Sequence, residues 1–235
     1  MGKLSLVATP IGNLEDITIR AIKTLFTADF ILCEDTRHSG LLISELTKRY
    51  HEFFDFNPDW KPRLIPYYDE IEEKKLPEMI ELLLQGNHLA LVSDAGTPLI
   101  SDPGFRLVRE CVKRNIPVES VPGPSALLAA LTSSGLPADN FMFLGYPPEK
   151  QQARITLFNK IKEMQKLIHS TYIFYCAPHK FLQTLDDVKS SLGDIGIVVA
   201  RELTKVHEEI WKGSVEQAKS RFAQIKGEVV VLFSL

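Results

Sequence analysis

The sequence has few cysteines, no long apolar run and no strong excess of charge. Its three cysteines, Cys33, Cys111 and Cys176, are too few and too widely spaced for a disulfide framework or a zinc site. No apolar stretch approaches the ~20 residues that cross a bilayer, and residues 1–10 lack the apolar core of a signal peptide. We therefore expect a cytoplasmic protein with reduced, buried cysteines and no membrane segment.

Several motifs of common enzyme classes are also missing. Neither G-x-x-x-x-G-K-[ST] nor G-x-G-x-x-G occurs, which disfavours nucleoside triphosphate and dinucleotide sites. The absence of H-E-x-x-H, of paired Cys/His spacings and of G-x-S-x-G disfavours metalloproteases, zinc sites and serine hydrolases. We expect no metal.

The charge of the chain is small but unevenly placed. The net charge of −3 argues against a protein that coats nucleic acid non-specifically. Residues 1–120 carry a net charge of −5, whereas residues 121–235 carry +2. Residues 150–180 contain six Lys and Arg residues and one acidic residue, Glu163. This basic stretch indicates either a solvated helix face or a surface that contacts phosphate.

The stretch from Leu89 to Gly104 organises the first half of the chain. Leu89–Val92 is a short apolar run typical of a buried strand, and a glycine-bearing loop follows it. Asp102 and Pro103 then predict the start of a helix, with Asp102 as its N-cap. Strand, loop and helix in this order place the loop at the carboxyl end of a parallel sheet, where open α/β sheets bind ligands.

The rest of the first half repeats this alternation. We predict strands at residues 4–8 and 117–121, and a second short apolar run predicts one at residues 30–33. Helical spacing predicts a helix with Asp16 as its cap. The aromatic stretch from Tyr50 to Tyr68 has no clear period, and we interpret it as a mobile segment or lid. Strict alternation predicts a parallel, doubly wound α/β domain over residues 1–120.

The pattern changes in the second half. We predict strands near residues 141–145, 171–175, 197–200, 209–212 and 229–233. Between them we expect a helix with Ile155, Phe158 and Ile161 on its apolar face, and its Lys and Arg residues on the other. A capping box, Ser214 with Gln217, predicts a last helix. Residues 121–235 are therefore expected to form a mixed α+β domain.

The loops at the predicted strand ends share glycine, proline and small polar residues but few bases. Such a pocket, with carbonyl groups and a carboxylate but no lysine, suits a neutral or cationic adenosine ligand. S-adenosylmethionine, whose sulfonium is cationic, is one candidate.

Six segments match one family in order along the chain. They are residues 7–16, 34–37, 93–104, 122–127, 174–179 and 200–205. Together they resemble the ribosomal RNA small-subunit methyltransferases I, a branch of the tetrapyrrole methylase superfamily, from residue 4 to about residue 232. The resemblance implies a two-domain class III methyltransferase fold, a homodimer, and S-adenosylmethionine held between the domains. It also implies 2′-O-methylation of a cytidine ribose in the decoding region of 16S rRNA, in the small ribosomal subunit.

The resemblance also implies which residues bind the cofactor. They are Pro10, Ala95, Gly96, Thr97, Ile100, Ser125, Ala126 and, as a weaker match, Cys176. Asp94 either faces the cofactor or caps N–H groups of its own loop, and the glycines and prolines of these loops alternatively only shape turns.

Methyl transfer to a ribose hydroxyl requires alignment of three atoms and removal of a proton from a weakly acidic alcohol. We hypothesise that Glu34 or Asp35 deprotonates or orients the ribose, while Arg37 and Lys205 hold phosphate. The alternative is that these charges form a structural network of salt bridges.

The chain departs from the family pattern in two places. Members usually carry Glu-Ser-Pro-His-Arg where this chain has residues 176–180, Cys-Ala-Pro-His-Lys. Many members also continue beyond the position that matches Leu235, so RNA affinity here is expected to come from the basic 150–180 stretch or from a dimer partner. Two other functions remain open: a small-molecule methyltransferase acting on a tetrapyrrole, and a non-catalytic RNA-binding or ribosome-assembly factor.

Overall fold

The computed structural model describes residues 1–50 and 63–235. The chain divides into two compact units, Met1–Ser125 and Ala126–Leu235, which are described one at a time. The domain boundary predicted after residue 120 stays a prediction. Within the described ranges, no helix combines the length and the apolar character needed to cross a membrane.

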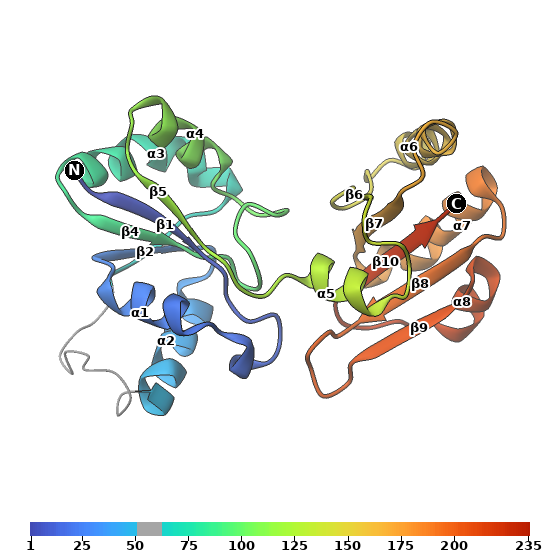
Figure 1. The fold of residues 1–235 in the computed structure, drawn as a ribbon, viewed down its shortest axis with the longest axis horizontal. Coiled ribbons are helices and arrows are strands. Elements are labelled where there is room, and N and C mark those ends of the chain that lie inside the picture. The colour runs from blue at the N-terminus through green and yellow to red at the C-terminus, as the bar shows by residue number, and fades with distance from the viewer. Residues whose placement is uncertain (51–62) are drawn as a thin grey trace. The chain divides into compact units, whose positions relative to one another are not determined.

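A five-stranded parallel sheet forms the centre of the first unit (Figure 1). Its strands are β1 (Lys3–Val7), β2 (Phe30–Cys33), β3 (Arg63–Pro66), β4 (His88–Leu91) and β5 (Val118–Val121), in the order β3-β2-β4-β1-β5. The connecting helices are α1 (Ile19–Thr27), α2 (Thr36–Tyr50), α3 (Asp69–Leu84) and α4 (Phe105–Lys113).

The helices cover both faces of this sheet (Figure 1). Helices α1 and α2 pack with Val7 and Val92 on one face, and α3 and α4 pack with Leu4 and Leu91 on the other. Because successive side chains of a strand point to opposite faces, strands buried on both sides need apolar residues throughout. That explains the short apolar runs of β2 and β4. The parallel sheet with helices on both faces confirms the predicted parallel, doubly wound α/β fold.

Two predicted helix starts are wrong. Helix α1 begins after Thr18, whose hydroxyl accepts a hydrogen bond from the Ala21 N–H, whereas Asp16 ends a separate 3-10 turn, Leu14–Asp16. Helix α4 begins after Gly104, which has φ +121°, and not at Asp102. Thr18 has the extended backbone that is typical of an N-cap residue, and Gly104 has a positive φ that glycine adopts readily.

The predicted lid from Tyr50 to Tyr68 is wrong where the structure describes it, and residues 51–62 lie outside the described part. Residues 63–66 form β3, which pairs with β2 at one edge of the described sheet. Four residues ending in Pro66 are too short to show a two-residue period, and proline in a strand is confined to edges and ends.

A mixed sheet forms the centre of the second unit. Its strands are β6 (Phe141–Phe143), β7 (Thr171–Cys176), β8 (Gly196–Arg201), β9 (Glu209–Ser214) and β10 (Val229–Ser234), in the order β6-β7-β10-β8-β9. Strand β6 is parallel to β7, and the other neighbours are antiparallel. The helices are α5 (Ala126–Ser133), α6 (Gln151–Met164), α7 (Phe181–Leu192) and α8 (Val215–Arg221), with a 3-10 turn, Pro178–Lys180. The predicted α+β character is confirmed.

One face of this sheet packs against α6, α7 and α8. Phe174, Val199 and Val231 on the sheet meet Phe158 on α6 and Leu185 on α7 in one core. Ser214 caps α8 through the predicted capping box, because its hydroxyl and the Gln217 side chain each bind the other residue's backbone N–H.

The basic face predicted for α6 is partly wrong. Arg154 points inward and is 2% exposed, and its Nε donates to Asp187 Oδ2 at 2.7 Å. The guanidinium Nη1 also donates to the carbonyl oxygens of Pro148 and Glu149. Arg154 therefore fixes the connection from β6 to α6 and is not part of the surface.

Candidate functional site

Three loops follow the carboxyl ends of adjacent strands in the first unit. We call them the Pro10 loop (residues 8–13, after β1), the central loop (Ser93–Gly104, after β4) and the Pro124 loop (residues 122–125, after β5). Strand β1 lies between β4 and β5. The chain leaves β1 through α1 on one face of the sheet and leaves β4 through α4 on the other. This divergence marks a switch point, where doubly wound sheets bind ligands.

Hydrogen bonds join the three loops into one surface. The N–H of Thr9 donates to the Gly96 carbonyl at 2.8 Å, and the N–H of Gly96 donates back to the Thr9 carbonyl at 3.0 Å. The Thr97 hydroxyl donates to the carbonyl of Pro124 at 3.0 Å. Pro10, Gly96 and Thr97, far apart in the sequence, therefore belong to one cluster of loops.

The central loop has an unusual backbone. Gly96 has φ +87°, and a Cβ atom built on it would lie 3.2 Å from Ile11 Cγ2. Leu99 and Ser101 also adopt positive φ, at 71° and 69°, which costs a residue with a side chain of order 1–3 kcal/mol. Such strain clusters at ligand-binding and catalytic sites. The missing Cβ at Gly96 leaves room for Ile11, so the central loop packs closely against the Pro10 loop.

The predicted cofactor residues fall in both units. Seven of the nine lie in the loops of the first unit, namely Pro10, Asp94, Ala95, Gly96, Thr97, Ile100 and Ser125. Ala126 is the first residue of α5, and Cys176 is the last residue of β7, both in the second unit. Their role in binding stays a prediction.

Acidic residues gather beside the central loop. The N–H of Asp35 donates to Asp94 Oδ1 at 3.3 Å, and the Glu34 carboxylate accepts the N–H of Asp94. These bonds tie the end of β2 to the end of β4. Burial, followed by the nearby carboxylates of Asp102 and Asp94, raises the pKa of Glu34 to about 7. A carboxylate of this kind can accept a proton near neutral pH.

Asp102 belongs to the same group of acids, although the sequence suggested only a helix cap. Burial raises the pKa of Asp102 to about 6, with Asp94 and Asp69 adding to the rise and a hydrogen bond from Ser93 opposing it. The sequence could have indicated this role, because Asp102 and Glu34 both lie in loops that follow predicted strands.

Asp35 and Arg37 bind each other. Arg37 Nε donates to Asp35 Oδ1 at 3.1 Å, and Arg37 Nη2 donates to Asp35 Oδ2 at 2.7 Å. This two-pronged contact holds the pKa of Asp35 well below its usual range. Asp35 is therefore a poor proton acceptor, whereas Arg37 remains exposed over most of its side chain. His38 lies against Asp94, with Nδ1 3.5 Å from Oδ2.

Lys205 lies in the second unit and is already paired. Its Nζ lies 3.1 Å from Glu202 Oε1 and 3.0 Å from Glu228 Oε2. Burial lowers the pKa of Lys205, but hydrogen bonds to Glu228 and Glu202 outweigh it and raise the pKa. The geometry matches the structural alternative for this residue more closely than a free phosphate contact.

Glu72, which the sequence did not single out, anchors the end of the central loop. It is 5% exposed, and its Oε1 accepts hydrogen bonds from the N–H groups of Gly104 and Arg106, each at 3.1 Å, and from the Tyr67 hydroxyl at 3.3 Å. A carboxylate from α3 thus caps α4 in place of a local side chain. Only its position on α3 opposite α4 creates this role, which explains why no local pattern predicts it.

We expect Glu72→Ala to destabilise the first unit by about 2 kcal/mol, because it leaves buried N–H donors without an acceptor. Urea unfolding measures the loss. Glu73→Ala is the matched control, since Glu73 makes only an exposed ion pair with Arg106, and it should change stability by less than about 1 kcal/mol. Equal losses in the two variants would contradict the capping role.

A small cavity in the second unit lies beside Cys176, one of the positions where the sequence departs from the family pattern. It measures about 80 Å³, and Arg154, Cys176, Lys180 and Thr184 are among its lining residues. Arg154 Nη2 is buried without a hydrogen-bond partner within the described residues. Burial raises the pKa of Cys176 to about 11, so its thiol is neutral and offers no charge to Arg154. The glutamate that the family resemblance leads us to expect at position 176 is an acceptor of the kind that Arg154 Nη2 lacks.

Cys176→Glu should therefore raise the midpoint of thermal unfolding by a few degrees, a gain of about 1 kcal/mol from the new hydrogen bond to Arg154. Cys176→Val, which fills similar space without an acceptor, should give no such rise. A lower midpoint for the glutamate variant than for the valine variant would show that the cavity does not accept a carboxylate.

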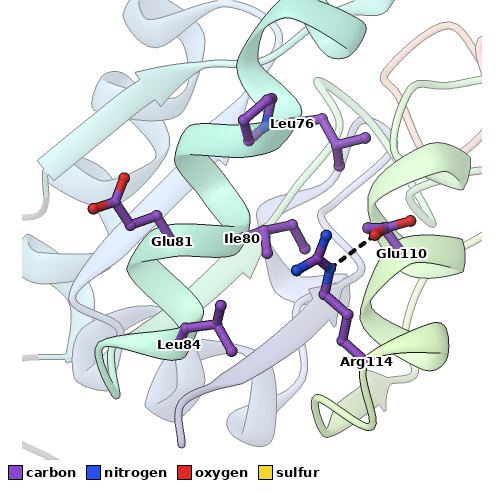
Figure 2. A pocket seen from close by; sticks show the side chains of 7 residues that line it. Leu76, Ile80, Glu81, Leu84, Glu110 and Arg114 are labelled. Atoms are coloured by element: carbon purple, nitrogen blue, oxygen red, sulfur yellow. Dashed lines mark hydrogen bonds and ion pairs between the residues drawn. The ribbon is translucent and has the colours of Figure 1, made fainter.

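A further hollow, of about 340 Å³, lies between α3 and α4 (Figure 2). Leu76, Ile80 and Leu84 supply most of its α3 side, and Arg114 donates to Glu110 on the α4 side, as Figure 2 shows. Pro77 and Glu81 on α3 complete its lining. Across residues 1–50 and 63–235, no group of three or more His, Cys, Asp or Glu side chains is arranged to hold a metal ion.

Comparison with known proteins places this chain among methylases. The family described as Tetrapyrrole (Corrin/Porphyrin) Methylases matches residues 3–219. A Thermotoga maritima protein named Ribosomal RNA small subunit methyltransferase I is 42% identical over 236 residues, covering 100% of this chain and 99% of the relative. A Synechocystis protein of the same name is 43% identical over 237 residues, covering 100% of this chain and 79% of the relative.

The fold is also that of solved methyltransferase structures. The uroporphyrin-III C-methyl transferase from Thermus thermophilus, crystallised with S-adenyl homocysteine, has a TM-score of 0.63 and 15% identity, covering 98% of this chain and 97% of that one. At this identity the likeness concerns the fold alone, and it confirms the predicted class III methyltransferase fold. Combined with the curated relatives, it shows that the chain belongs to the ribosomal RNA small subunit methyltransferase I family of the tetrapyrrole methylases.

Proposed function

We propose that this chain transfers a methyl group from S-adenosylmethionine to the ribose 2′-hydroxyl of a cytidine in the decoding region of 16S rRNA. Membership of the rRNA methyltransferase family supports the substrate class. The observation that carries the mechanism is the Glu34 carboxylate, with a pKa near 7, at the carboxyl end of β2 beside the central loop. A proton acceptor matched to neutral pH is what activation of a ribose hydroxyl needs.

The loops of the first unit fit the cofactor. Gly96 lets the central loop pack closely against Ile11 of the Pro10 loop, which shapes this cluster of loops, and the central loop contains no Lys or Arg that would repel a cationic group. The cofactor supplies an activated methyl group on a cationic sulfur. We assign Pro10, Asp94, Ala95, Gly96, Thr97, Ile100 and Ser125 to its binding, with Ala126 and Cys176 as contributions from the second unit.

Within the acidic group, we assign the roles by the partners of each residue. Glu34 accepts or orients the ribose proton, because burial and neighbouring acids raise its pKa. Asp35 positions Arg37 through its two-pronged contact, and the exposed Arg37 guanidinium holds a phosphate. Lys205 is the weakest of the four assignments, since Glu202 and Glu228 already bind its ammonium.

We also propose that the protein acts in the cytoplasm as a homodimer, in keeping with a substrate that is ribosomal RNA and with the family resemblance. The proposal competes with a tetrapyrrole methyltransferase of the same fold and with an assembly factor that binds RNA without catalysis. No feature of the described residues favours either competitor.

Radiolabelled S-adenosylmethionine tests the proposal. The protein is incubated with small ribosomal subunits from cells that lack the modification and, in parallel, with a uroporphyrinogen. The proposal predicts label in 16S rRNA and none in the tetrapyrrole. Label in the tetrapyrrole alone would assign the competing enzyme, and cofactor binding without transfer to either acceptor would contradict the proposed substrate.

A further inference from the structure

In the surface predicted to hold RNA phosphate, the basic 150–180 stretch, three of the six Lys and Arg side chains are already paired, while Lys150, Lys160 and Lys162 are exposed. Arg154 is buried against Asp187. Lys166 pairs with Glu163 at 2.6 Å, and Lys180 pairs with Glu149 at 3.1 Å. Half of the positive charge predicted for this surface is thus taken up by acidic partners, and the second unit has another basic surface.

A basic groove lies near the opposite edge of the second sheet, next to the edge strand β9. It encloses about 560 Å³, within the ~300–1,000 Å³ range of ligand-binding clefts. Its lining comes from the end of β8, from β9, from the end of α8 and from the segment after α8. The lining residues are Arg201, Glu209, Arg221, Phe222, Ala223, Gln224, Ile225 and Lys226. We call it the Arg221 groove.

One carboxylate holds two guanidinium groups in place in this groove. Glu209 Oε2 accepts from Arg201 Nε at 2.9 Å, and Glu209 Oε1 accepts from Arg221 Nε at 3.0 Å and from Arg221 Nη2. Arg201 Nη1 also donates to the Lys226 carbonyl at 3.4 Å. The Arg221 guanidinium lies over the Phe222 ring, 5.6 Å from its centre. Both arginines are thus pre-positioned on rigid elements, which reduces the entropy lost when they bind a ligand.

The charges of the groove are not balanced. Arg201, Arg221 and Lys226 face only one acid, Glu209. The Lys226 side chain is exposed and forms no ion pair with any residue the structure describes, and Arg221 is 54% exposed. Each arginine retains N–H groups beyond those that Glu209 accepts. A groove with surplus positive charge and fixed guanidinium forks suits phosphate oxygens.

We propose that the Arg221 groove holds backbone phosphates of the rRNA substrate. The inference rests on the proposed function for the identity of the RNA, and it moves phosphate binding in the second unit from Lys205 and α6 to Arg201, Arg221 and Lys226. The exposed guanidinium plane of Arg221 also offers a surface on which a base can stack.

Lys226→Gln, Arg221→Gln and the double variant test the groove. Binding to 16S RNA and to small subunits lacking the modification is measured without cofactor over a series of salt concentrations. We expect each single variant to lose several-fold in affinity and the double variant about tenfold or more, with a salt dependence shallower by about one phosphate contact per residue removed. The affinity for S-adenosylmethionine and kcat at saturating subunit concentration should stay close to wild type, so that the loss falls on KM.

Lys160→Gln is the matched control, because Lys160 is an exposed lysine on α6, outside the groove. It should bind RNA as the wild type does. Groove variants that bind RNA as tightly as the control, with the same salt dependence, would overturn the proposal. If the variants lose RNA affinity while the wild type methylates no RNA, the groove stands and the proposed function falls. If the wild type binds no RNA, both fall.

Discussion

Replacing Glu34 by Gln is expected to lower kcat by about 10²–10⁴-fold, the usual contribution of a general base. The amide keeps the size of the side chain and its ability to accept the N–H of Asp94, but it cannot take a proton. The affinity for S-adenosylmethionine should change little, because the cofactor loops are joined by bonds that do not involve Glu34. Single-turnover methylation and equilibrium cofactor binding, measured on the same preparation, separate the two effects.

The pH dependence gives an independent signature. In the wild type, kcat should rise with pH and level off above an apparent pKa near 7, because the base must be deprotonated to act. Asp102, with a pKa of about 6, is coupled to Glu34, so the profile reports the pair and not one residue alone. The Glu34→Gln variant should lose this rise.

The Glu34→Gln substitution should raise stability at high pH although it lowers activity. Folding raises the pKa of Glu34 from 4.5 to about 7, so the folded state holds a proton that the unfolded state has released. Stability therefore falls as pH rises between these two values. Glu34→Gln removes that loss and should be more stable than the wild type at pH 8, but not at pH 4. Glu81→Gln, an exposed position on α3, is the control. A variant with full activity, or with cofactor affinity and kcat lost equally, would contradict the assignment.

Asp187→Ala should cost about 3–5 kcal/mol of stability in the second unit, because it leaves the Arg154 guanidinium buried without its charge partner. Both side chains of this pair are 2% exposed. Urea unfolding measures the cost.

The double variant Arg154→Met with Asp187→Leu separates the cost of an unpaired charge from the value of the pair. Replacing both partners with apolar side chains should recover much of the stability lost in Asp187→Ala. If the single variant does not fold, the stability of the double variant still reports the value of the pair. A loss below about 1 kcal/mol in the single variant, or an equally unstable double variant, would contradict this account.

The fold followed from the sequence where local patterns carry the information. Apolar runs bounded by turn residues marked buried strands such as β2 and β4, since strands covered on both faces are mostly apolar. The capping box at Ser214 could also be predicted, because both of its residues lie within one helical turn. Strand β3 could not be predicted, because it is short, lies at an edge of the sheet and ends in Pro66.

The site was only partly predictable, because its important contacts join distant segments. Glu34 could be named from its place at a strand end. Its raised pKa, however, depends first on burial and then on Asp102 and Asp94, which the fold brings near it. Glu72 acts on an N–H group 32 residues away, and Arg154 on a carboxylate 33 residues away, so no local pattern reveals either partner. Lys166 and Lys180 looked available for phosphate, but their acidic partners occupy them.

The central claim is ribose methylation of small-subunit rRNA with Glu34 as the base. Small subunits lacking the modification are labelled by the wild type and by Glu34→Gln with radioactive S-adenosylmethionine, and the rRNA is hydrolysed in alkali. A methylated 2′-oxygen cannot attack the adjoining phosphate. The account therefore predicts label in an alkali-resistant dinucleotide that contains cytidine, formed by the wild type and strongly reduced in the variant. Label released in mononucleotides, which places the methyl group on a base, would contradict it.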